Sequence, residues 1–195
     1  MMEKYEIRLG ESLSTAWKIF CKGPEVFITL TFGLACVSVL FSKLGSWLTL
    51  IPSCLGPAAF YLAAEDGNHK ERISFESVKP IVNLFPQLLA LTVVKSIAIL
   101  LGFILFVIPG IYLTVILCFA ELFVVLEGKP FLEAMKASKE LVERNFWGVL
   151  GLCIFSFGLL FSGVLLVFLG LLVTAPLATL LFYVVFRRVN LHVVS

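Results

Sequence analysis

Long apolar runs, separated by short polar segments, recur along the whole chain. The longest such run includes the residues from Phe146 to Phe186, none of which is charged. At about 1.5 Å per residue this stretch is about 60 Å of helix, twice the roughly 30 Å hydrocarbon core of a bilayer, so it holds two spans. The full pattern predicts six spans, near residues 26–42, 44–64, 86–108, 111–127, 146–167 and 171–187. We therefore expect an all-α, polytopic transmembrane helix bundle that forms a single membrane domain over residues 1–195.

Two polar segments have the periodicity of amphipathic helices. In residues 12–22 the apolar side chains share one face and Lys18 and Lys22 lie off it, which predicts that the N-terminal segment 1–23 lies in the headgroup region. In residues 128–145 the charged side chains point away from an apolar face. We call the apolar side of this segment its α-face; it consists of Phe131, Met135, Ser138, Leu141 and Val142. This helix is predicted to lie on the membrane, with Trp147 following it at the interface.

Proline and glycine mark the predicted turns and kinks. Pro109 and Gly110 suit positions i+1 and i+2 of a type II turn, so a tight hairpin is predicted between the third and fourth spans. Pro52 and Pro57 are expected to kink the second span and Pro176 the sixth, which requires neighbouring helices to satisfy the freed carbonyl groups.

The basic residues determine the predicted orientation. Six spans place thirteen of the fifteen on the side of the N-terminus and only Lys43 opposite, with Lys95 inside a span. The thirteen are Lys4, Arg8, Lys18, Lys22, Lys70, Arg72, Lys79, Lys129, Lys136, Lys139, Arg144, Arg187 and Arg188. By the positive-inside rule both termini are then cytoplasmic. The same topology places Trp17, Tyr61, Trp147 and Tyr183 at the inner interface and Trp47 and Tyr112 at the outer one.

Composition supports the membrane class and narrows the chemistry. The chain is 60% apolar and 14% charged, against about 45–50% and about 25% in soluble domains. Acidic residues nearly balance the basic ones, so no nucleic-acid partner is expected. The five cysteines form no CxxC pair, and the sequence holds no recognisable hydrolase, metalloprotease or nucleotide-binding motif. We therefore expect no enzyme activity, no catalytic residue, no metal site and no cofactor.

Lys95 and Glu121 are the only charged residues inside the predicted spans. Both are on the order of 10 Å from the cytoplasmic edge, on helices joined by the predicted hairpin. Opposite charges at matched depth can pair, which offsets much of the cost of either one alone. Two interpretations remain open: a polar gate or substrate contact, and a purely structural pin or a snorkelling Lys95 beside a near-interface Glu121.

Four segments carry a resemblance to a known group of proteins. They are Ile108–Tyr112 (IPGIY), Leu126–Gly128 (LEG), Glu133–Ser138 (EAMKAS) and Asn145–Trp147 (NFW). The chain resembles bacterial six-span membrane proteins of undetermined role, among them the YciC-like proteins and the membrane domain attached to some glycerophosphodiester phosphodiesterases. The resemblance implies a membrane module in the bacterial cytoplasmic (inner) membrane. It does not imply the phosphodiesterase activity, because the chain has no segment to supply the soluble catalytic barrel.

Two functional hypotheses follow. In the first, the protein is a non-enzymatic membrane module that contacts membrane lipid or a partner membrane protein through its amphipathic helices, above all residues 130–144. In the second, it is a small transporter or lipid-handling protein in which Lys95 and Glu121 line a polar path. The substrate, the partner and the oligomeric state are left open by the sequence.

Overall fold

The computed structural model describes residues 8–44, 50–69, 73, 80–165 and 170–194, and these ranges form nine helices. The helices are α1 (Leu9–Cys21), α2 (Pro24–Leu44), α3 (Leu50–His69), α4 (Ile81–Leu105), α5 (Val107–Ile116), α6 (Ala120–Glu127), α7 (Phe131–Glu143), α8 (Phe146–Leu165) and α9 (Leu171–Val194). The protein is an all-α helix bundle, as the apolar pattern predicts.

Five helical segments are long and apolar enough to cross a membrane. They are Pro24–Lys43, Ile81–Leu105, Val107–Glu127, Phe146–Leu165 and Leu171–Asn190. The predicted span at 44–64 corresponds to α3, which is not among them. Its helix begins later, at Leu50, and continues through polar residues to His69. Trp47 of that predicted span lies outside the described residues.

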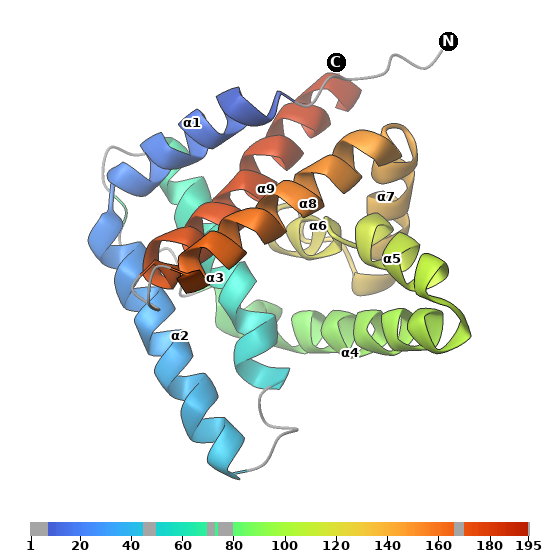
Figure 1. The fold of residues 1–195 in the computed structure, drawn as a ribbon, viewed down its shortest axis with the longest axis horizontal. Helices are drawn as coiled ribbons and strands as arrows, with labels where there is room; N and C mark the ends of the chain where they lie inside the picture. The colour runs from blue at the N-terminus through green and yellow to red at the C-terminus, as the bar shows by residue number, and fades with distance from the viewer. Residues whose placement is uncertain (1–7, 45–49, 70–72, 74–79, 166–169, 195) are drawn as a thin grey trace.

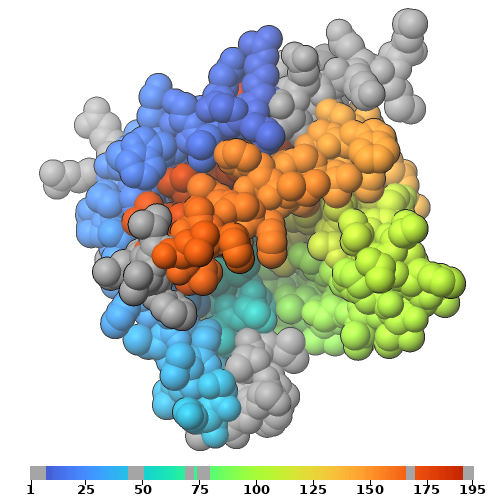
Figure 2. All heavy atoms as spheres, in the orientation of Figure 1, coloured from blue at the N-terminus to red at the C-terminus, as the bar shows by residue number. Residues whose placement is uncertain are grey.

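Helix α9 is the central element of the bundle. It packs against α8, α1, α2 and α3. Figure 1 shows α8 and α9 as a diagonal pair, with α1 and the C-terminal end of α9 at the top and with α2 and α4 extending away from the body. On the face shown in Figure 2, α8 lies between α1 and the hairpin formed by α4 and α5.

Helix α6 is short and buried on nearly every side. Ala120, Leu122, Phe123, Val124 and Val125 are all buried. A helix that is apolar all round is stable in a protein core or in a membrane, and α6 is enclosed by protein, with α3, α4 and α7 packed against it.

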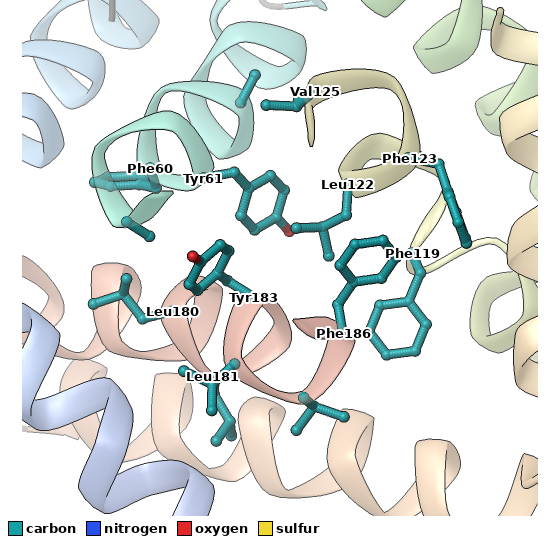
Figure 3. Close-up of a cluster of buried hydrophobic side chains, with 14 of the residues drawn as sticks. Phe60, Tyr61, Phe119, Leu122, Phe123, Val125, Leu180, Leu181, Tyr183 and Phe186 are labelled. Atoms are coloured by element: carbon teal, nitrogen blue, oxygen red, sulfur yellow. The ribbon is translucent and has the colours of Figure 1, made fainter. Parts of the chain in front are cut away.

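The aromatic side chains around α6 form the centre of the core. Figure 3 shows Tyr61 of α3, Leu122 of α6 and Phe186 of α9 converging there. The ring of Phe123 meets that of Phe186 edge to face, with 4.9 Å between the centroids. This packing holds α6 in place at the middle of the molecule.

The reversal between α4 and α5 differs from the predicted turn. The chain turns at Phe106, whose φ of −167° and ψ of 157° are extended, while Pro109 and Gly110 lie inside α5. Proline is tolerated there because the first turn of a helix needs no N–H donor. Gly110 is required for close packing, because a Cβ at this position would lie 2.5 Å from the ring of Phe103 in α4. The prediction of a type II turn at Pro109 and Gly110 was therefore wrong, although the predicted tight hairpin is present.

Tyr112 also differs from its predicted position. Its hydroxyl donates a hydrogen bond to Glu143 Oε1 of α7 at 3.1 Å, and its ring lies 5.6 Å from that of Phe146. Tyr112 is therefore beside the junction of α7 and α8, at the same end of the molecule as Trp147. The prediction that the two aromatic residues mark opposite interfaces was wrong, because Tyr112 is bonded to Glu143, which lies only four residues before Trp147.

Candidate intramembrane site at a helix break

The stretch from Val107 to Glu127 is not one continuous helix. It is interrupted between the end of α5 at Ile116 and the start of α6 at Ala120. Across the break the backbone tightens, and the N–H groups of Cys118 and Ala120 donate to the carbonyls three residues earlier. The N–H of Phe119 and the carbonyl of Ile116 are left without a backbone partner by this change, and in an apolar interior each would be costly.

A serine of α7 satisfies both groups. The hydroxyl of Ser138 accepts a hydrogen bond from the N–H of Phe119 at 3.2 Å and donates one to the carbonyl of Ile116 at 2.7 Å. Ser138 is fully buried. Its position shows why the α-face of α7 carries a small polar residue: the side chain completes the hydrogen bonding of the broken helix.

The position of α7 corrects the expectation that its α-face lies on lipid. Ser138, Leu141 and Val142 are buried against the rest of the bundle, while Phe131 and Met135 are half-buried. Helix α7 packs against α6, α4 and α5, so its apolar stripe is already covered by protein. Trp147, in contrast, is 75% exposed at the start of α8.

The break brings the two intramembrane charges together. Lys95 lies in the middle of α4, and Glu121 is the second residue of α6, where the positive end of the helix dipole favours a carboxylate. The Lys95 ammonium donates to Glu121 Oε1 at 3.0 Å, and the side chains are 21% and 13% exposed. The pairing that sequence reasoning considered is present in the structure.

Further polar groups lie on α4, in the break and on α8. The thiols of Cys118 in the break and Cys153 in α8 are close neighbours. The hydroxyls of Thr92, one turn before Lys95, and Ser156, one turn after Cys153, are buried and have no hydrogen-bond partner among the described residues. Within those residues no three His, Cys, Asp or Glu side chains form a group suited to a metal ion.

A second polar cluster, at the end of α3, was missed by sequence reasoning. Glu65 accepts a hydrogen bond from the Tyr183 hydroxyl at 2.7 Å and forms an ion pair with Arg187 at 2.6 Å. The side chains of Glu65 and Arg187 are 29% and 35% exposed. The only sequence signal was the position of Glu65 directly after an apolar run, since its partners lie more than a hundred residues away.

These features define the class of the protein: a polytopic integral membrane helix bundle with a charged pair at a helix break. The chain belongs to the family described as "Domain of unknown function (DUF7847)", whose model matches residues 75–194. The matched region includes α4 to α9, and so contains the break, Ser138, Lys95 and Glu121. No curated protein and no solved structure matches the chain.

Proposed function

We propose that the protein is a non-enzymatic, multi-pass protein of the bacterial cytoplasmic membrane that contacts lipid or a partner protein on the cytoplasmic side. The observation that supports this most is the docking of α7, whose α-face is buried while its charged side is exposed. A helix fixed in this way presents a rigid polar surface at the edge of the membrane. Both termini are cytoplasmic in this proposal, because the basic residues gather on their side.

The charges of the two amphipathic helices differ, and so do the partners that they suit. From Glu133 to Arg144, α7 and the residue after it carry three acidic and three basic side chains, all exposed. This surface has no net charge to attract anionic lipid, so a protein partner suits it better. Helix α1 exposes Trp17 and Lys18 side by side, and this combination suits lipid headgroups.

The experiment changes one exposed apolar side chain on each of the two amphipathic helices. Wild-type protein, Leu132→Glu and Trp17→Glu are purified in mild detergent, and the bound lipids and proteins are identified by mass spectrometry. Leu132 is 56% exposed and Trp17 is 49% exposed, so both variants are expected to fold. We expect Leu132→Glu to lose protein partners and Trp17→Glu to lose lipid.

A lipid-facing variant of α8, Phe157→Leu, is the control, since Phe157 is exposed but lies on neither amphipathic helix. If the bound lipids and proteins are the same in all four preparations, the proposed contact surfaces are wrong.

A second candidate function, a small transporter or lipid-handling protein, is favoured by one observation. Lys95 and Glu121 meet at an interrupted helix, and interrupted helices with internal charge often border substrate pathways in transporters. In this function the two side chains line a polar path through the bundle.

The native cysteines test for such a path. Cys118 lies in the break itself and is only partly buried, as is Cys153. If water reaches the ion pair, a small charged methanethiosulfonate reagent will modify these thiols, and Cys118→Ala and Cys153→Ala identify which one reacts. Modification by membrane-permeant N-ethylmaleimide alone would exclude a hydrated path and count against transport.

A further inference from the structure

The hairpin of α4 and α5 ends in a tip that is apolar in every side chain. Residues 97–111 contain no charged, amide or hydroxyl side chain. Phe106, at the reversal, is 73% exposed, and Ile104 and Ile108 beside it are 72% and 80% exposed. The tip of a hairpin that crosses a membrane reaches the far headgroups, where Tyr, Trp and polar residues are enriched. This tip lacks all of them.

The backbone of the tip is also suited to an apolar environment. The N–H of Phe106 donates to the carbonyl of Gly102 at 3.0 Å, and the N–H of Gly110 donates to the carbonyl of Phe106 at 3.3 Å. Pro109 has no N–H to leave unsatisfied. A Cβ on Gly102 would lie 3.1 Å from the Cα of Gly110, so the two helices approach with almost no space between their backbones. Two backbone N–H groups at the reversal are therefore bonded within the hairpin, and a third position has none.

Tyr112 fixes the depth of this tip. Its hydroxyl is bonded to Glu143, which also pairs with Lys139 at 3.7 Å; these two charged side chains are 46% and 54% exposed and so lie outside the hydrocarbon. Phe106 is six residues from Tyr112, about 9 Å along a helix. Even with roughly 10 Å added for the side chains of Tyr112 and Glu143, the tip is about 20 Å deep, short of the about 30 Å core.

We propose that α4 and α5 form a re-entrant hairpin, a wedge that enters the bilayer from the side of α7 and ends among the lipid acyl chains. The partner of this surface is lipid hydrocarbon. The inference deepens the lipid contact proposed above and rests on the position of α7 at the membrane edge.

The charge distribution is the same for a wedge and for two full spans. In both arrangements the segments before α4 and after α6 lie on one side, so the basic residues of α7 stay with those of the N-terminus. The positive-inside rule therefore does not distinguish a wedge from two full spans. The depth of the tip in the bilayer does distinguish them.

Single cysteines in a variant lacking the five native ones provide the test. Phe106→Cys probes the tip, Lys43→Cys probes the far end of α2, and Lys136→Cys probes the charged side of α7. Each is exposed to a membrane-impermeant maleimide in right-side-out and in inside-out vesicles. We expect Lys43→Cys and Lys136→Cys to react in opposite preparations, and Phe106→Cys to react in neither until detergent is added.

Reaction of Phe106→Cys from the same side as Lys43→Cys would overturn the proposal in favour of a complete crossing. Reaction from the side of Lys136→Cys would also overturn it, because the tip would then lie among headgroups. Ile104→Cys, at the neighbouring exposed position, replaces Phe106→Cys if that variant fails to fold.

A nitroxide on the same cysteine gives an independent measure of depth. We expect molecular oxygen, which concentrates in hydrocarbon, to relax the label more than a water-soluble nickel chelate does; the reverse order would place the tip in water and overturn the wedge. Neither measurement depends on the bound lipids and proteins of Leu132→Glu and Trp17→Glu, so this inference and the proposed function can fail separately.

Discussion

The hydroxyl of Ser138 in α7 donates a hydrogen bond at 2.7 Å to the carbonyl of Ile116, the last residue of α5. The same oxygen accepts the N–H of Phe119 on the other side of the helix break. One buried side chain therefore joins the amphipathic helix to the interruption beside which Lys95 and Glu121 meet. The position of α7 and the geometry of the charged pair depend on each other through this contact.

Replacing Ser138 tests this link. Ser138→Ala leaves a buried donor and a buried acceptor without partners, and we expect a loss of about 1–3 kcal/mol in the free energy of unfolding. Ser162→Ala is the matched control, because its hydroxyl is exposed and bonds only to Leu159 of its own helix. Thermal unfolding in detergent compares the two. Equal midpoints would show that the Ser138 bonds do not stabilise the break.

Mutations of the two residues of the Lys95–Glu121 ion pair are expected to have strongly non-additive effects on stability. Lys95→Met or Glu121→Gln leaves one largely buried group without its partner, and we expect each to lower stability by about 2–4 kcal/mol. The double variant is expected to recover much of this loss, because no unpaired charge remains. Removal of the exposed pair of Arg8 and Glu11 should cost less than about 1 kcal/mol. A double-mutant cycle in which the Lys95 and Glu121 effects simply add would contradict the pairing.

Mutations in the polar cluster at the end of α3 are expected to lower stability by graded amounts. Tyr183→Phe removes one hydrogen bond to Glu65 and is expected to cost about 1 kcal/mol, whereas Glu65→Gln also weakens the ion pair with Arg187 and should cost more. Tyr112→Phe serves as the comparison, since its hydroxyl bonds to the exposed Glu143 and solvent can replace that contact. The series is measured by denaturant or thermal unfolding. A Glu65→Gln protein as stable as wild type would show that this cluster does not join α3 to α9.

The glycines of the hairpin predict a steric effect. Gly110→Ala places a methyl group against the ring of Phe103, and Gly102→Ala places one against the backbone of Gly110. We expect each to destabilise the protein by about 1–3 kcal/mol through separation of α4 and α5. Gly158→Ala in α8, where nothing lies within 4 Å of the new Cβ, should be neutral or slightly stabilising. If all three variants unfold at the same temperature, the close approach of the two helices is not a source of stability.

Several features followed from the sequence because they depend on local pattern alone. The apolar runs predicted the helical bundle and six spans, five of which correspond to helical segments long and apolar enough to cross a membrane. The charge pattern of residues 128–145 predicted α7 and identified which residues share its apolar face. The matched depths of Lys95 and Glu121 showed that they can pair, since two opposite charges in an apolar region have few other partners, but left a snorkelling Lys95 as an open alternative.

Other features were decided only by the tertiary structure. The site of the reversal at Phe106 depends on how closely Gly102 and Gly110 let two helices approach. The partners of Glu65 lie on a helix that is distant in sequence. Whether the apolar face of α7 meets lipid or protein also depends on packing, because hydrocarbon chains and a protein core are equally apolar and favour the same residues. The sequence determined which surfaces avoid water, and the tertiary structure determined what covers them.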